Sequence, residues 1–170
     1  MSDTAFARHF IGRLHAAVNA HDVNALVALC CDDVVWQDPA APHTLRGRDD
    51  VRWFHQHVMF AALPDVQIEL IDGPFISSDG SGLAVRLRIE GTMSGALDPP
   101  GFAPTRGRLR FETAEFSRLR GGLLAEHVVV LDMLNLARQI GAMPAADSVA
   151  GRVGVWLQHA AALCSRLRGL

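Results

Sequence analysis

The sequence contains no lysine and no tyrosine, and all 16 of its basic residues are arginines. These arginines form no basic run, and the net charge of the 170 residues is −2, so nucleic acid is a poor candidate partner. No run of about 18 apolar residues occurs, which argues against a membrane-spanning helix. The first residues lack the charged and then apolar order of a signal peptide, so we expect a cytoplasmic protein.

Cysteine is scarce as well. Two of the three cysteines, Cys30 and Cys31, are adjacent, which fits neither a disulfide framework nor a metal-binding spacing. We therefore expect reduced, half-buried thiols. No group of His, Cys and carboxylate residues has the spacing of a zinc site, and no glycine-rich phosphate loop occurs, so the sequence indicates no metal.

The chain is rich in hydrophobic residues, at 49%, and has the length of one domain. Its two halves differ in hydrophobic period. Helical spacing in the first half predicts helices at residues 4–19, 23–31 and 49–62, with one strand at 34–38 that Pro39 ends. Alternation in the second half predicts strands at residues 66–72, 83–92, 106–120 and 123–132. Helices followed by a run of antiparallel strands are typical of an α+β fold.

Two more helices are predicted after the strands, at residues 133–140 and 148–167. The last one carries an apolar stripe. We expect this stripe to pack against protein rather than a membrane surface, because its polar face has little positive charge.

Gly121-Gly122 is a strong hairpin signal, because both glycines can adopt positive φ. A two-residue turn there places Arg120 opposite Leu123. Counting back along both strands predicts three further opposed pairs, namely Glu115 with Val128, Thr113 with Val130, and Phe111 with Asp132. Since side chains alternate between faces, the six residues of these three pairs should share one face of the sheet and His127 should lie on the other.

Asp132 ends the last predicted strand and is open to two interpretations. A carboxyl group among apolar neighbours has a raised pKa that suits proton transfer. Alternatively, Asp132 caps the helix that starts near Leu134, since aspartate is a favoured capping residue. The residues alone leave both open.

Other candidate site residues lie in the first half of the chain. Trp36 and Asp38 share one face of a predicted strand. Trp36 can therefore line a pocket, and Asp38 can face the opening of that pocket. Trp36 is equally suited to a core, and Asp38 to a turn before Pro39. His55 and His57 are about 200° apart around a helix, so only one can face a site. We take His55 as the candidate, and a packed or solvated histidine is the alternative interpretation.

Three stretches of the sequence form a pattern of short motifs in a fixed order and spacing. The first runs from Asn19-Ala20-His21-Asp22 to Gln37-Asp38-Pro39, and the second contains Gly47-Arg48-Asp49-Asp50-Val51 and Leu63-Pro64-Asp65-Val66. The third contains Gly91-Thr92-Met93-Ser94-Gly95, Gly121-Gly122 and Leu136-Ala137-Arg138-Gln139-Ile140-Gly141. Together these stretches resemble the SnoaL-like polyketide cyclases of the NTF2-like superfamily. Met93 stands where relatives in that family often carry a histidine.

The resemblance implies a cone-shaped domain over residues 1–142, with a curved antiparallel sheet wrapped by the N-terminal helices and residues 143–170 as a helical extension. It also implies a homodimer that forms through the outer face of the sheet. The implied activity is cyclisation of an apolar, polyketide-like small molecule by acid/base catalysis, without metal or organic cofactor. The family's general acid/base is an aspartate ending the last strand, which corresponds to Asp132. We expect substrate contacts from Trp36, Asp38, His55, Leu87, Met93, Phe111, Thr113, Glu115, Val128 and Val130.

Two other functions stay open. Arg88-Ile89-Glu90 resembles the Arg-x-Asp of limonene-epoxide-hydrolase-like relatives, which open epoxides or form ethers. That chemistry needs two carboxylates at the pocket, for which Asp132 and Glu115 are the candidates. The fold also carries non-enzymatic binding modules, and a pocket filled by side chains would favour that class.

Overall fold

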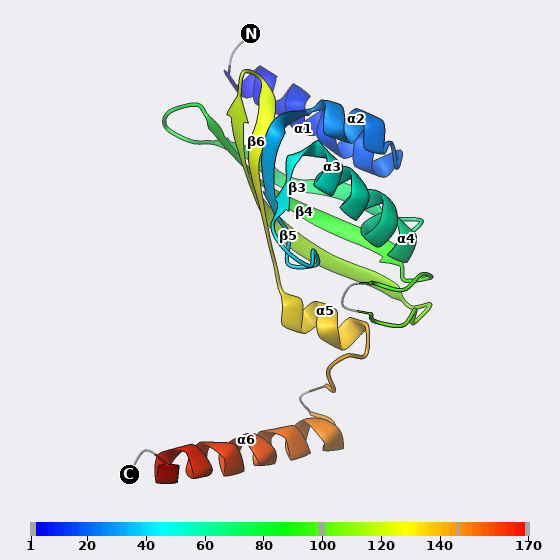
Figure 1. Ribbon diagram of the computed structural model, residues 1–170, viewed down its shortest axis with the longest axis vertical. Coiled ribbons are helices and arrows are strands. Elements are labelled where there is room, and N and C mark those ends of the chain that lie inside the picture. The colour runs from blue at the N-terminus through cyan, green and yellow to red at the C-terminus, as the bar shows by residue number, and fades with distance from the viewer. Residues whose placement is uncertain (1–2, 99–100, 146, 169–170) are drawn as a thin grey trace.

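The computed structural model describes residues 3–98, 101–145 and 147–168. A curved six-stranded sheet carries the first helices on one face, and the last helix lies apart from this body (Figure 1). The predicted α+β architecture is confirmed. Within the described residues, no helix is both long enough and apolar enough to cross a lipid bilayer.

The helical layer follows the predicted segments closely. Asp22 accepts a hydrogen bond from the Ala25 backbone N–H at 2.9 Å and so caps the second helix. A π-helical turn, η1, interrupts the third predicted helix. The elements are α1 (Asp3–Asn19), α2 (Val23–Ala28), α3 (Gly47–Phe54), η1 (His55–Met59) and α4 (Phe60–Ala62).

The sheet has the strand order β2-β1-β6-β5-β4-β3, in which β1 and β6 are parallel and the other pairs antiparallel. The strands are β1 (Cys30–Gln37), β2 (Leu45–Arg46), β3 (Gln67–Ile76), β4 (Gly82–Thr92), β5 (Arg108–Arg120) and β6 (Leu123–Leu131). The first strand begins at Cys30, so the prediction that a helix extends to residue 31 is wrong. Parallel pairing of β1 with β6 brings Trp36 beside His127.

The β5–β6 hairpin turns at Gly121 and Gly122, whose φ angles of 60° and 81° confirm the predicted turn. Beyond the first pairs, however, the register shifts by one residue, because Ala125 of β6 is an extra residue in a bulge. Glu115 therefore pairs with Val129 rather than Val128. Since a one-residue slip exchanges the faces of a strand, His127 lies on the inner face and Val128 and Val130 on the outer face.

The main core lies between the inner face of the sheet and helices α1 to α3, and its fully buried members include Leu26, Phe54 and Leu124. After β6 come α5 (Met133–Gln139) and α6 (Val149–Arg168). The expectation that α6 packs against protein is not met within this chain, since 68% of Trp156 is exposed.

Candidate active site

An apolar pocket opens between the helices and the inner face of the sheet, with a cavity volume of about 100 Å³. Its wall is mainly aliphatic and aromatic. Seven of the residues expected to contact substrate line it, namely Trp36, Asp38, His55, Met93, Phe111, Thr113 and Glu115. The polar groups are few, which is typical of small-molecule sites.

Three other expected substrate contacts do not line this pocket. Val128 and Val130 lie on the outer face of the sheet because of the bulge, and 52% of Val130 is exposed. Leu87 lies on the inner face but is buried in the main core. The predicted pocket positions of these three residues are wrong.

The prediction that Asp132 lies in the pocket is also wrong. Its side chain is exposed, and its Oδ1 accepts a hydrogen bond from the Asn135 backbone N–H at 2.9 Å. Asp132 is therefore the N-cap of α5, as the second interpretation of the sequence had it. The Asp132 carboxylate therefore lacks the apolar surroundings that the catalytic interpretation required.

Two histidine rings lie close to the indole ring of Trp36. The ring of His127 lies 4.0 Å from the Trp36 ring, measured between centroids, and the ring of His55 lies 5.0 Å from it. His127 is itself 1% exposed, and its Nδ1 is hydrogen-bonded to Ser117 Oγ at 2.9 Å. Ser117 Oγ and His127 Nδ1 can each donate to the other, and Nε2 of the same ring faces Glu115.

Glu115 is the anionic centre of this group. Its Oε2 lies 3.3 Å from His127 Nε2, an ion-pair contact that is not aligned as a hydrogen bond, and its Oε1 accepts a hydrogen bond from Thr113 Oγ1 at 3.1 Å. Burial alone would raise the pKa of Glu115, but His127, His15 and Thr113 outweigh burial and hold this pKa below its usual range. Glu115 is therefore ionised at neutral pH.

Asp38 is shifted in the opposite direction. It directly follows β1, and its Oδ1 accepts a hydrogen bond from the Ala40 backbone N–H at 2.8 Å. Burial raises the pKa of Asp38, and the charge of Glu115 raises it further, against the opposing effects of Ala40, His127 and Trp36. The pocket thus contains one carboxyl group whose pKa is raised and one whose pKa is lowered.

His15 and His127 belong to this group but were not predicted. His15 lines the pocket from α1, and burial lowers its pKa, so the ring is neutral at neutral pH. A usable signal was present, since His15 falls on the apolar stripe formed by Ile11, Leu14 and Val18. No local signal placed His127 correctly, because its face depends on the bulge at Ala125.

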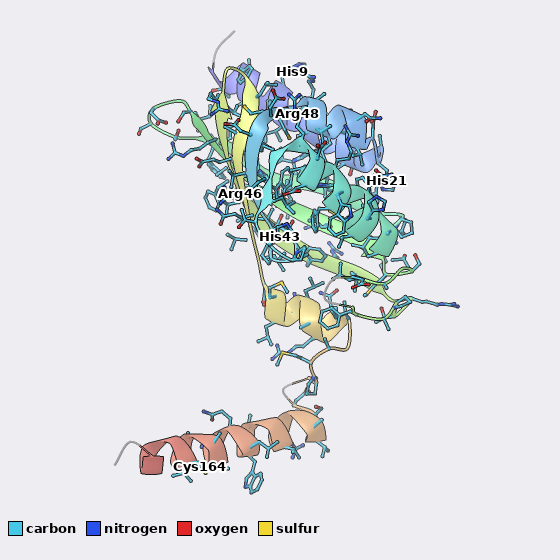
Figure 2. All side chains as sticks on the ribbon, in the orientation of Figure 1. His9, His21, His43, Arg46, Arg48 and Cys164 are labelled. Atoms are coloured by element: carbon cyan, nitrogen blue, oxygen red, sulfur yellow. The ribbon has the colours of Figure 1, made fainter. Side chains whose placement is uncertain are left out.

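The loop histidine His43 is exposed and lies outside the pocket, near Arg46 (Figure 2). No group of three or more His, Cys, Asp or Glu side chains within the described ranges is arranged to hold a metal ion. Cys30 and Cys31 are buried and unpaired, whereas Cys164 on α6 is exposed, contrary to the expected half-buried position.

His55 begins the π-helical turn, and its Nδ1 donates a hydrogen bond to the Val51 carbonyl oxygen at 2.8 Å. π-Turns occur frequently at functional sites. Burial lowers the pKa of His55 from 6.5 to about 4, so the ring is neutral at neutral pH and its Nε2 is an acceptor.

This lowered pKa predicts a loss of stability in acid. The unfolded chain takes up the His55 proton near pH 6.5 but the folded chain only near pH 4, so stability is lost as the pH falls between those values. We expect the unfolding free energy of the wild type to fall by about 3 kcal/mol more than that of His55→Gln between pH 7 and pH 4. Urea unfolding measures this, with exposed His9→Gln as the control. Equal losses in wild type and His55→Gln would contradict the assignment.

Comparison with solved structures shows the same architecture in several proteins. AclR from Streptomyces galilaeus, described as a candidate hydroxylase, has a TM-score of 0.69 and 23% identity, and the match covers 98% of this chain and 96% of AclR. A candidate polyketide cyclase from Xanthomonas campestris has a TM-score of 0.68 and 16% identity, over 82% of this chain and 99% of that one. SalBIII, an epoxide hydrolase/cyclase-like enzyme of pyran ring formation in the polyether salinomycin, has a TM-score of 0.64 and 24% identity, over 79% and 97%.

At sequence level, none of the curated proteins compared matches the chain. The SnoaL-like domain family, by contrast, matches residues 11–127, which extend from α1 to the His127 position in β6. This range contains every polar residue of the pocket, and it ends before Asp132. The chain therefore belongs to the SnoaL-like domain family.

Proposed function

We propose that this protein is an acid/base catalyst that closes rings in apolar, polyketide-like small molecules, with Asp38 and Glu115 as its proton-transfer groups. The observation that carries the proposal is the pair of carboxyl groups in one apolar pocket whose pKa values are shifted in opposite directions. Carboxyl groups separated in this way are suited to work as an acid and a base at the same pH.

In an intramolecular aldol reaction, Glu115 acts as the base and Asp38 as the acid. Glu115 takes the proton of an acidic C–H group, and the resulting carbon nucleophile forms a bond to a carbonyl carbon of the same molecule. The π electrons of the carbonyl pass to its oxygen, which takes the proton of Asp38. Solvent exchange then returns the proton from Glu115 to Asp38, so no oxidant or reductant is consumed.

The walls of the pocket favour ring closure over other reactions. Phe111, Met93 and Leu97 are among its apolar contacts, and they can hold a flexible chain with its two reacting ends together. Orientation of this kind supplies a large part of the rate increase in intramolecular reactions. Similarity to a candidate polyketide cyclase supports the proposed substrate class.

Epoxide opening is the second candidate function, because the pocket contains the two carboxyl groups that this chemistry needs. Asp38 would protonate the epoxide oxygen as its C–O bond breaks, while Glu115 removes the proton of an attacking hydroxyl group. The fold similarity to SalBIII supports this alternative.

Proton transfer from carbon can be tested without the natural substrate. We expect the protein to exchange the α-protons of 2-tetralone, a bicyclic ketone, for deuterium at least about tenfold faster than buffer alone. ¹H NMR in D₂O measures the exchange. Asp132→Asn is the control, and it should match the wild type because Asp132 is exposed and caps α5. Exchange no faster than in buffer would contradict the aldol form of the proposal.

We also propose a homodimer formed through the outer face of the sheet. Phe75, Ala84, Phe116 and Val128 are paired side by side across four strands on that face. More than half of Phe75 and of Phe116 is exposed in the single chain. A contiguous apolar row of this kind is typical of a surface that is covered by a partner.

A further inference from the structure

Two side chains in the wall of the pocket, His15 and Trp36, have a buried nitrogen that makes no hydrogen bond within the protein. Among the described residues, three buried side-chain atoms make no hydrogen bond, namely His15 Nε2, Trp36 Nε1 and His127 Nε2. His15 and Trp36 line the pocket, and Trp36 is 5% exposed. Buried polar groups in folded proteins almost always have a partner, so an unpartnered one in a pocket wall indicates a group supplied by a ligand.

The type of atom restricts what the ligand supplies. A neutral histidine nitrogen can donate or accept, so His15 does not distinguish between ligand groups. The indole nitrogen of Trp36 can only donate, and its partner must therefore be an acceptor. A hydrocarbon surface would leave this N–H unsatisfied, whereas an oxygen atom would satisfy it.

The Trp36 N–H lies on the same side of the pocket as Asp38, the proposed acid. Trp36 and Asp38 are two residues apart in the chain and both line the pocket, and the Trp36 N–H acts on the protonation of the Asp38 carboxyl although the two make no aligned hydrogen bond. An oxygen held by Trp36 would therefore lie within reach of the acid that donates a proton.

We propose that Trp36 Nε1–H and the Asp38 carboxyl together bind the carbonyl or epoxide oxygen of the substrate, the atom that becomes negatively charged during the reaction. This inference rests on the proposed function and specifies the substrate further: it is an apolar molecule with a carbonyl or epoxide group, an electrophilic carbon bonded to oxygen, at one end. As the carbon nucleophile attacks a carbonyl, or as an epoxide C–O bond breaks, the electron pair passes to this oxygen. Trp36 donates a hydrogen bond to it and Asp38 gives it a proton. A preorganised donor at such an oxygen stabilises the transition state.

The test compares two ligands that differ in one oxygen. 2-Tetralone and tetralin share a bicyclic skeleton, but only 2-tetralone has a carbonyl group. We expect the wild type to bind 2-tetralone more tightly than tetralin, and Trp36→Phe to lose roughly threefold to tenfold of the 2-tetralone affinity with little change for tetralin. Isothermal titration calorimetry measures both affinities.

A second measurement does not depend on the variant. The Trp36 indole N–H signal in a ¹H–¹⁵N NMR spectrum of the wild type should shift on addition of 2-tetralone and much less on addition of tetralin. Trp53→Phe and Trp156→Phe identify the other two indole signals by their loss, and both residues are exposed, so these variants also serve as matched controls for folding and binding.

The outcomes separate this inference from the proposed function. Equal affinity of the wild type for the two ligands, or an unshifted Trp36 signal, would overturn the oxygen site even if deuterium exchange occurs. Selective binding of 2-tetralone with a shifted Trp36 signal but without deuterium exchange would support the oxygen site and count against aldol catalysis.

Discussion

Replacing Asp38 with asparagine is expected to lower the turnover number by roughly two to four orders of magnitude. Asparagine has nearly the same shape and can still accept the hydrogen bond from the Ala40 backbone N–H, so the turn after β1 should persist. It cannot donate a proton of comparable acidity, and the substrate oxygen would then develop charge without an acid beside it. Steady-state kinetics on the cyclisation or exchange reaction measures the loss, and circular dichroism checks the fold.

Two further variants make this result specific. Glu115→Gln should also be strongly impaired, because it removes the proposed base and leaves His127 Nε2 without its ion-pair partner. Asp132→Asn should keep near wild-type turnover, since that carboxylate lies outside the pocket. A strong loss in Asp132→Asn with full activity in Asp38→Asn would overturn the assignment and restore the aspartate that the family resemblance indicated.

The pH profile gives an independent check of the same assignment. The acid must be protonated to act, so activity should decline as the pH rises through the raised pKa of Asp38. Activity should also decline as the pH falls through the lowered pKa of Glu115, because the base is then protonated. If Asp38→Asn leaves the alkaline decline of the remaining activity unchanged, Asp38 is not the group that causes it.

The largest loss of stability is expected for Phe54→Ala, at about 3–5 kcal/mol of unfolding free energy. Phe54 is 1% exposed and packs in the main core, where it also backs the pocket wall. Truncation to alanine removes the ring from apolar surroundings and leaves a cavity continuous with the pocket. Urea or thermal unfolding measures the loss.

The neighbouring residue supplies the matched control. Trp53 lies on the other side of the same helix and is 44% exposed, so Trp53→Ala should cost less than about 1 kcal/mol. Similar losses in the two variants would contradict the packing arrangement of α3 on the sheet. If Phe54→Ala is as stable as the wild type, the packing of α3 against the sheet does not stabilise the main core.

The site was predictable from the sequence only in part. Trp36, Asp38 and His55 were candidates from residue type and spacing within single elements, and all three line the pocket. Glu115 and Thr113 were assigned to the correct face by counting from the Gly121-Gly122 turn. The cross-strand partners predicted for them were wrong, because a bulge adds one residue, Ala125, to β6. No local residue preference marks Ala125 as a bulge residue.

The role of general acid/base was assigned to Asp132 because the family's aspartate also ends the last strand, and position along the chain was not enough to place it in the pocket. Its local signal for helix capping was as strong as its signal for catalysis, and the structure shows the capping contact and places the side chain outside the pocket. Conversely, Asp38 looked like a turn residue, and it is one, yet the same side chain also borders the pocket. The two roles do not exclude each other, because the carboxyl has two oxygens.

The sequence by itself determined the class of fold, the order of helices and strands, and the turn at Gly121-Gly122, since all of these depend on local periodicity and backbone preference. Only the tertiary structure decided which ionisable groups meet. His15, Asp38, Glu115 and His127 come from three strands or strand ends and one helix, and their shared burial, which shifts the pKa values of His15, Asp38 and Glu115, exists only when these elements pack together. Burial and the distance between charges are properties of the folded chain, and no spacing along the sequence specifies them.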